Sequence, residues 1–295
     1  MAGIALFLNG ARGLAVLDRL LSESMDCGQV VVPTGFISAS LNEKAANGRF
    51  QIVEAPDVND PAFIEQAASW QADLFLIAGF PTIFKPPLIG IPRIGILNLH
   101  GGRVPEYRGG SPLNWQMING EPSVGLSVLV LAEGIDDGAL VAERSIPLTP
   151  SMTIADLHHR ANPLFGDMAV EALQGMMDGS LIPKPQDDAR AAYWHQRNDE
   201  DGRITPRTMT ADQADRMIRA LTRPYPGAFC LRRGRKVRLF AARPADFVLR
   251  GVPGRLCQIQ GQGPFLICAD RALLILDYLD EGDPDRRLKS GDHLD

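Results

Sequence analysis

Short apolar runs separated by amphipathic stretches fill the first two hundred residues. Apolar runs without polar alternation predict strands buried on both faces, and apolar residues at helical spacing, such as Leu14, Leu17 and Leu21, predict helices. Strands alternating with helices favour a Rossmann-like α/β domain on a mostly parallel sheet. The predicted strands are 3–8, 29–33, 50–53, 73–78, 94–100, 124–131 and 139–146, and the predicted helices are 14–21, 60–70, 113–118 and 153–174.

The pattern changes near Ser180. Residues 181–201 are rich in Pro, Gln and charge, which is typical of an extended surface connection. Beyond them we expect a helix at 211–221 and a small β-rich, OB-like domain of short strands. We place the large domain at 1–200 and the small one at 201–295, and we expect the last residues to be weakly ordered. The predicted short strands are 228–231, 237–241, 254–259, 264–268 and 272–276.

The composition narrows the class of protein. The 295 residues are 45% hydrophobic, which allows a sizeable core and excludes disordered, collagen-like and disulfide-rich chains. The four cysteines have no metal-ligand spacing, so we expect no metal. Without an apolar run of about 18 residues or a basic, apolar N-terminal leader, we expect a cytoplasmic protein with no membrane partner.

The net charge of −5 argues weakly against a nucleic-acid partner, but it conceals a basic segment. Between residues 232 and 255, eight basic residues face one acidic residue, Asp246. Such a segment fits a phosphate backbone, or it solvates the outer face of the small domain. Few aromatic residues are available there for base stacking. The basic residues are Arg232, Arg233, Arg235, Lys236, Arg238, Arg243, Arg250 and Arg255.

Polar side chains end the strand predicted at 94–100. Asn98 and His100 are two residues apart, so both side chains leave the same face at the edge where open parallel sheets bind ligands. The amide can stabilise a developing oxyanion and the imidazole can move a proton. We expect Asp136 to orient the imidazole, because the chain returns to this edge after its next long strand. The three residues predict acyl transfer without a covalent intermediate.

Three motifs around these residues resemble the formyltransferases that use 10-formyltetrahydrofolate. They occur in the family's order and spacing, and the resemblance resumes at 197–202 and 224–229, which is typical of members with a small C-terminal barrel-like domain. The motifs read Asn98-Leu99-His100, Val104-Pro105-Glu106-Tyr107-Arg108-Gly109 and Gly134-Ile135-Asp136-Asp137-Gly138. The resemblance implies that Asn98 bonds the formyl oxygen, that His100 assists proton transfer, and that Asp136 supports His100 and helps to take protons from the attacking amine.

The resemblance also implies where the formyl donor, 10-formyltetrahydrofolate, binds. In this family the folate ring lies between the loop after the fourth strand and the loop before the catalytic aspartate, mostly against backbone groups. The corresponding residues are Gly79, Phe80, Thr82 and Ile83 in the first loop, and Leu131, Ala132, Gly134 and Ile135 in the second.

The loop after His100 departs from the commonest family pattern. It reads Gly101-Gly102-Arg103, and with residues 111–115 it resembles the sugar-modifying branch, which implies a nucleotide-linked amino sugar as acceptor. Asn9 and Arg12 are candidate acceptor contacts, with a plain turn as the alternative. Arg103, Tyr107 and Arg108 are further candidates, and for the last two the alternative is anchoring of the loop.

Other acceptors stay open. Methionyl-tRNA formyltransferases share both domains, and the basic segment keeps tRNA as an alternative partner. A formyltransferase for another small amine, such as hydroxyornithine, is a third reading, and a binding module without activity is a fourth. The sequence leaves open the sugar, the nucleotide and whether the protein forms a homodimer.

Overall fold

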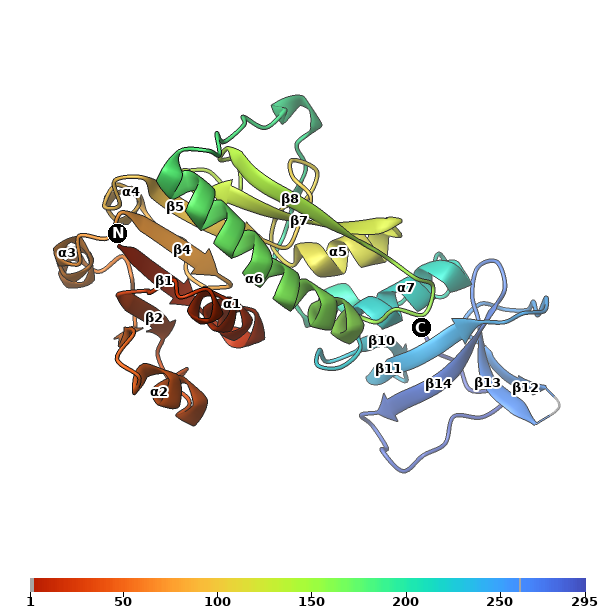
Figure 1. The fold of residues 1–295 in the computed structure, drawn as a ribbon. Helices are drawn as coiled ribbons and strands as arrows, with labels where there is room; N and C mark the ends of the chain where they lie inside the picture. Colours follow the sequence, from red (N-terminus) through yellow and green to blue (C-terminus); the bar gives the residue numbers. More distant parts are fainter. Residues whose placement is uncertain (1–2, 260) are drawn as a thin grey trace. The chain divides into compact units, whose positions relative to one another are not determined.

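The computed structural model describes residues 3–259 and 261–295, which form two compact units. The first unit contains the described residues up to 112 together with 125–146 and 158–194. The second contains 113–124, 147–157 and the residues from 195 onward. Both units therefore draw on segments that are distant in the sequence (Figure 1).

A seven-stranded sheet has the order β3-β2-β1-β4-β5-β7-β8. The pairs β1–β2, β1–β4, β2–β3 and β4–β5 are parallel, and β5–β7 is antiparallel. The mostly parallel α/β sheet is thus confirmed. Its strands are β1 (Ile4–Leu8), β2 (Gln29–Pro33), β3 (Gln51–Ala55), β4 (Leu74–Ala78), β5 (Gly95–His100), β7 (Ser123–Val130) and β8 (Leu140–Pro147).

Helices pack on both faces of this sheet. The longest, α6, lies beside α1 on one face (Figure 1), and the two come so close that a Cβ on Gly166 would lie 2.8 Å from the Cβ of Arg19. The other helices up to residue 178 are shorter, and α5 belongs to the second unit apart from its first residue. The bounds are α1 (Gly10–Ser22), α2 (Ala39–Ala45), α3 (Pro61–Ser69), α4 (Pro86–Ile89), α5 (Pro112–Asn119) and α6 (Ile154–Asp178).

The helices α1 and α3 differ in how well the sequence predicts the residue at which they begin. The Asp60 carboxylate accepts a hydrogen bond from the N–H of Ala62 at 2.9 Å, and Pro61 stands in the first turn of the helix predicted at 60–70. The first helix begins at Gly10 rather than Leu14. Its opening turn contains small residues and Arg12, so the apolar periodicity does not reveal it.

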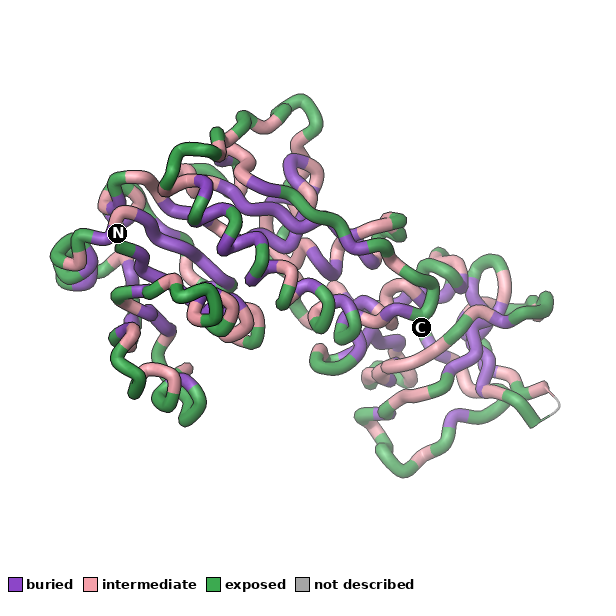
Figure 2. The backbone as a smooth tube through the Cα atoms, in the orientation of Figure 1, coloured by how far each residue is buried: buried purple, intermediate pink, exposed green. Residues whose placement is uncertain are grey.

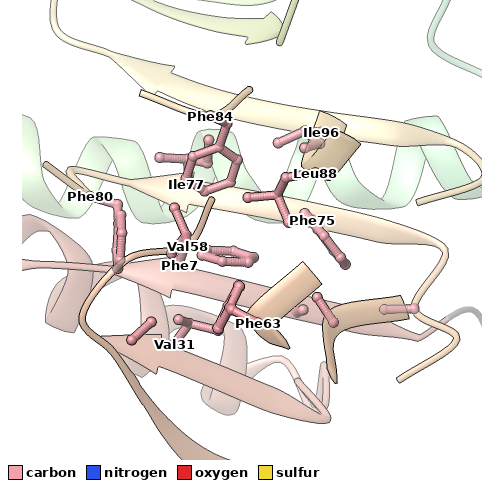
Figure 3. Packing of buried hydrophobic residues seen from close by; sticks show 14 residues of the cluster. Phe7, Val31, Val58, Phe63, Phe75, Ile77, Phe80, Phe84, Leu88 and Ile96 are labelled. Carbon is pink, nitrogen blue, oxygen red and sulfur yellow. The ribbon is translucent and has the colours of Figure 1, made fainter. Parts of the chain in front are cut away.

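Aromatic residues fill the core on the face toward α3 and α4. The ring of Phe7 lies 4.9 Å from that of Phe84, 5.3 Å from that of Phe75 and 5.7 Å from that of Phe80, measured between centroids (Figure 3). Phe63 of α3 packs on the same ring. Figure 2 shows the buried residues running along the strands of the large sheet. The core therefore extends into the loop that follows β4.

The second unit contains a five-stranded sheet of order β10-β11-β14-β13-β12 with antiparallel pairs, which confirms the small C-terminal β domain. The helix α7 begins with a capping box, in which Thr210 Oγ1 accepts from the N–H of Gln213. Its elements are α7 (Ala211–Leu221), β10 (Ala228–Arg232), β11 (Arg235–Pro244), β12 (Leu256–Ile259), β13 (Gln262–Ile267) and β14 (Ala272–Asp280).

The final residues are paired, so the expectation that they are weakly ordered is wrong. Asp295 and Leu231 exchange two backbone hydrogen bonds of 2.6 and 2.7 Å, and the N–H of Leu294 donates to the carbonyl of Gly254 at 2.8 Å. The side chain of Leu294 is fully buried. The last five residues thus join β10 to the chain just before β12, the two edges of the sheet. The polar composition of these last residues gives no sign that their backbone is paired.

Among the helices within residues 3–259 and 261–295, none is both long and apolar enough to cross a membrane.

Candidate active site

Asn98, His100 and Asp136 lie in contact in the first unit. Asn98 Nδ2 donates to Asp136 Oδ1 at 3.3 Å, and His100 Nδ1 lies 3.4 Å from Asp136 Oδ2. The His100 side chain is 6% exposed and that of Asp136 is 13% exposed. A carboxylate therefore lies against both an amide donor and an imidazole, in surroundings that largely exclude water.

The hydrogen-bond partner of His100 Nε2 defines the tautomer of the neutral imidazole. Nε2 lies 2.7 Å from the backbone carbonyl of Tyr107. A carbonyl can only accept a hydrogen bond, so Nε2 carries the hydrogen. In the neutral ring Nδ1 then bears the lone pair, and this is the nitrogen beside Asp136.

Asp136 reaches the site by a different route from the one expected. β7 runs antiparallel to β5, with Ser127 opposite His100 and Val130 opposite Leu97, so its end lies away from the carboxyl edge of β5. The expectation that the chain returns to that edge is wrong. The loop after β7 instead folds back until Asp136 meets the two side chains. Strand direction in this part of the sheet is not visible in the apolar pattern.

The loop carrying Asp136 is tightly constrained. Asp136 has φ +50°, in the left-handed region that costs an ordinary residue about 1–2 kcal/mol and that Asp and Asn adopt more readily than most. The N–H of Gly109 donates to Asp136 Oδ2 at 2.8 Å. A Cβ on Gly138 would lie 1.8 Å from the carbonyl oxygen of Val130, so this position requires glycine.

The altered loop after His100 packs directly on the imidazole. A Cβ on Gly102 would lie 2.5 Å from the carbonyl oxygen of Tyr107 and 2.6 Å from His100 Nε2. Ser127 Oγ, fully buried on β7, donates to the carbonyl of Gly102 at 2.7 Å. The loop backbone thus forms one wall of the site, and only glycine leaves room for the ring.

Arg108 and Tyr107 lie in the interior. Arg108 is 2% exposed, and its guanidinium donates to Gln186, to Asp188 and to the hydroxyl of Tyr193. Tyr107 is 4% exposed. Of the two roles left open for them, these contacts describe anchoring of the loop.

A short parallel pairing holds this loop to the segment that follows α6. The two-residue strand β6 (Arg108–Gly109) pairs with β9 (Tyr193–Trp194). The Trp194 ring stacks on Tyr107 with centroids 5.4 Å apart and an interplanar angle of 11°. Sequence reasoning missed these partners, because residues 181–201 resemble a surface connection.

Arg12 and Arg103, two of the candidate acceptor contacts, have different neighbours. Arg12 Nη1 donates to the carbonyl of Leu99 at 3.4 Å, and its guanidinium lies 4.4 Å from the centre of the Phe165 ring. Burial, together with the charge of Arg12, lowers the pKa of His158. Arg103, with its side chain 30% exposed, has Nε 3.9 Å from a carboxylate oxygen of Glu106. Arg12 thus contacts the backbone of the strand that bears Asn98 and His100.

Asn9 lies beside the first predicted folate loop. Its N–H donates to the carbonyl of Ala78 at 3.2 Å. Gly79 has φ +78°, and a Cβ there would lie 3.3 Å from the carbonyl oxygen of Asn9. The turn after β1 and the loop after β4 are therefore adjacent.

Both predicted folate loops start from the aromatic core. Phe80 is 9% exposed and belongs to that core, and Leu131 packs against it. Ile83 and Ile135, one on each loop, are 74% and 53% exposed. Thr82 and Ala132 are half-buried and Gly134 is exposed. Each of the two loops thus exposes one large apolar side chain next to the aromatic core.

Asn59 supports the first of these loops and was missed by sequence reasoning. Its amide nitrogen donates to the carbonyl of Ile83 at 3.0 Å, and its amide oxygen accepts from the N–H of Lys85 at 2.8 Å. A polar residue just before a capped helix gives no sequence signal for such a role.

Acidic residues from other segments pair with three of the eight residues of the basic segment, Arg232, Lys236 and Arg238. Lys236 bonds Asp199 and Glu200, each at 2.5 Å. Arg238 bonds Asp199 and, at 2.7 Å, Glu281. These contacts lower the pKa of Asp199 to about 2, chiefly through the hydrogen bond from Arg238.

Arg232 pairs with Asp280, whose side chain is 1% exposed. Together with the pairs of Lys236 and Arg238, this contact ties part of the basic segment to acidic residues of the second unit itself. Counting charges along the chain missed these partners because they lie some 35 to 50 residues away.

The chain also matches known families along most of its length. The sequence model of the formyl transferase family matches residues 21–173, and that of the formyl transferase C-terminal domain matches 197–284. The chain belongs to the formyltransferase family. It is therefore a folate-dependent one-carbon transferase, as the resemblance implies.

Named relatives agree with this assignment. A methionyl-tRNA formyltransferase of Pelobacter propionicus is 33% identical over 225 residues, which is 76% of this chain and 69% of that protein. A second, from Syntrophus aciditrophicus, is 30% identical over 220 residues, which is 74% of this chain and 70% of that protein.

Solved structures share the fold. An N-formyltransferase from Helicobacter canadensis, in complex with folinic acid and dTDP-3-aminofucose, has a TM-score of 0.72 at 16% identity and covers 94% of this chain and 100% of its own. HypX from Aquifex aeolicus, in complex with tetrahydrofolic acid, has a TM-score of 0.65 at 19% identity and covers 95% of this chain. This chain spans less than half the length of HypX.

Proposed function

We propose that this chain transfers a formyl group from 10-formyltetrahydrofolate to the amino group of a nucleotide-linked amino sugar. The observation that carries the proposal is the contact of Asp136 with both Asn98 and His100, at 3.3 and 3.4 Å. An amide donor, an imidazole and a carboxylate at such distances are the groups that direct attack of an amine on a formyl carbon requires.

The loops at 79–83 and 131–135 would hold the donor. Ile83 and Ile135 suit the faces of a flat ring, while the loop backbone supplies polar groups for its edges. Phe80 points into the core, so its part in binding would come from its backbone. When bound, the donor supplies an activated formyl group on nitrogen.

His100 and Asp136 would handle the proton. As the amine nitrogen bonds to the formyl carbon, its proton moves to Nδ1 of His100, because Nε2 already donates to Tyr107. The carboxylate of Asp136 stabilises the imidazolium. The proton then passes to the departing donor nitrogen as its bond to carbon breaks. Asn98 would donate an N–H to the formyl oxygen while negative charge develops there.

The acceptor is inferred from the loop and the charges. Gly102 keeps the altered loop against His100, and Arg103 on the same loop is partly exposed, as acceptor contact requires. Asn9 caps α1 beside the loop after β4, Arg12 lies in the first turn of α1 against the site strand, and we assign both to the acceptor as well. The paired cations of the small domain weigh against an extended contact with nucleic acid.

Initiator methionyl-tRNA is the second candidate acceptor. The relatives of 30–33% identity carry the name methionyl-tRNA formyltransferase. Arg233, Arg235 and Arg250 of the basic segment are exposed and suit phosphate contacts. Another small amine, such as hydroxyornithine, follows as a third.

The test is to incubate the purified protein with 10-formyltetrahydrofolate and, separately, a panel of amino-sugar nucleotides, initiator methionyl-tRNA and hydroxyornithine. Mass spectrometry then follows the mass of the added formyl group. We expect turnover with an amino-sugar nucleotide and none with His100→Asn. Turnover with the tRNA alone would overturn the sugar assignment, and full activity of His100→Asn would overturn the site.

A further inference from the structure

Gln186 joins the loop of the proposed catalytic aspartate to a buried arginine. Its Nε2 donates to the carbonyl of Asp136 at 2.8 Å and to that of Gly138 at 2.7 Å. Its Oε1 accepts from Nε and Nη2 of Arg108 at 3.0 and 2.9 Å. All four hydrogen-bonding positions of one amide are thus used on two segments that are far apart in the sequence.

The chemistry of these partners leaves the amide only one orientation. Arginine can only donate and backbone carbonyls can only accept, so the amide oxygen must face Arg108 and the amide nitrogen must face Asp136 and Gly138. No aliphatic or acidic side chain of the same length can make both sets of contacts. Position 186 therefore requires the amide group of glutamine, and a side chain of the same size without that group would not suffice.

Asp136 is attached at two points, its carboxylate and its backbone carbonyl, and the Gln186 amide makes the second attachment. We call these two attachments the hold on Asp136. On one side, the N–H of Gly109 donates to the carboxylate of Asp136. On the other, Gln186 bonds the backbone of the same residue and is itself bound to Arg108, the neighbour of Gly109. Side chain and backbone of Asp136 are thus both attached to β6, which limits how far the carboxylate can move from His100.

The two attachments meet at a residue with a left-handed backbone. Asp136 has φ +50°, so the loop conformation stores free energy that neighbouring contacts must offset. Two charge-neutral hydrogen bonds from Gln186, each polarised by the Arg108 guanidinium, can supply that stabilisation.

We infer that Gln186 is a positioning residue for the formyl transfer reaction, which acts by holding the left-handed backbone of Asp136 so that its carboxylate stays against His100. The inference rests on the proposed roles of Asp136 and His100. Gln186 bonds the backbone carbonyls of Asp136 and Gly138, so its effect is transmitted through the loop.

The decisive variant is Gln186→Glu. A carboxylate can still accept from Arg108, but its second oxygen then faces two carbonyl oxygens instead of donating to them. We expect kcat to fall by about 10- to 100-fold, as expected for a displacement of somewhat less than 1 Å at a reacting group. The shorter Gln186→Ala, in which water can take over part of the bonding, should change kcat in the same direction and serves if Gln186→Glu does not fold.

Asp188→Asn is the matched control. Asp188 accepts from the same Arg108 nitrogen, Nη2, at 2.6 Å, but it is 80% exposed, and its bond to Arg108 does not reach the Asp136 loop. We expect its kcat to stay within about threefold of the wild type. An equal loss in Asp188→Asn and Gln186→Glu would overturn the inference, since the effect would then come from Arg108 alone.

A second readout separates positioning from general stability and needs no acceptor. In ¹⁵N-histidine NMR spectra, His100 is assigned by its absence in His100→Asn. We expect the His100 ring nitrogens to shift in Gln186→Glu and to keep their wild-type positions in Asp188→Asn. Unchanged His100 resonances and kcat in Gln186→Glu would overturn the positioning role. A fully active His100→Asn would instead overturn the proposed site itself.

Discussion

Gly102→Ala tests whether the loop after His100 shapes the reacting imidazole. The added methyl carbon would lie 2.5 Å from the carbonyl oxygen of Tyr107, 2.6 Å from His100 Nε2 and 2.9 Å from Cβ of Pro112. Ordinary contacts at such a carbon are 3.4 Å or more, so the neighbours must move by almost 1 Å. None of them is the free end of a flexible side chain.

Two magnitudes follow from this crowding. Overpacking of this kind costs about 1–3 kcal/mol of unfolding free energy. A displacement of about 1 Å at a reacting group costs about 100-fold in rate. We therefore expect kcat of Gly102→Ala to fall about 100-fold while most of the protein remains folded at 25 °C.

The assay pairs kcat for formyl transfer with urea unfolding, using Gly28→Ala as control. Gly28 has an ordinary backbone, and a Cβ there would lie 4.0 Å from its nearest neighbour, the carbonyl oxygen of Ile4. Gly28→Ala should retain the wild-type kcat and the wild-type unfolding free energy. If Gly102→Ala kept kcat within about threefold of the wild type, the assignment of this loop as a wall of the site would be refuted.

Three further predictions concern the second unit. Asp199→Asn should lower the unfolding free energy by about 1 kcal/mol at pH 7, a value reduced for the 38% exposure of the side chain. Because the pKa of Asp199 is lowered to about 2, its contribution to the unfolding free energy is present above pH 4 and is lost as the pH falls toward 2. The urea midpoints of the variant and the wild type should therefore converge in acid. Divergence of the midpoints would contradict the prediction. Asp280→Asn should cost about 3–5 kcal/mol in urea unfolding, because it leaves Arg232, 10% exposed, without its charge partner; a cost below about 1 kcal/mol would contradict a buried ion pair. Leu294→Ala should cost about 2–5 kcal/mol by the same measurement, since the side chain is fully buried in the segment that joins the sheet edges, and wild-type stability would show that this segment does not hold the domain.

The fold class was predictable because its signals are local. Buried parallel strands appear as unbroken apolar runs, and Asp60 before Pro61 marks a helix start that depends only on its neighbours. Asn98 and His100 were found for the same reason, because two residues on one strand share a face whatever the rest of the chain does.

The rest of the site depends on contacts between distant segments. The approach of Asp136 depends on the antiparallel direction of β7, and the hold on its loop depends on Gln186, 50 residues further along the chain. A polar segment such as 181–201 gives no sign that it covers a buried arginine. A buried Arg108 in the motif requires acceptors from somewhere, but only the structure identifies them.

The central claim is that the Asp136 carboxylate works with His100 in formyl transfer, and Asp136→Asn tests it most directly. Asparagine has the same shape, tolerates the left-handed backbone and can still accept from the N–H of Gly109. The measurement is kcat for formyl transfer from 10-formyltetrahydrofolate, with unfolding followed in parallel. We predict a loss of about 100-fold or more with unchanged stability. A folded Asp136→Asn protein with the kcat of the wild type would contradict the account.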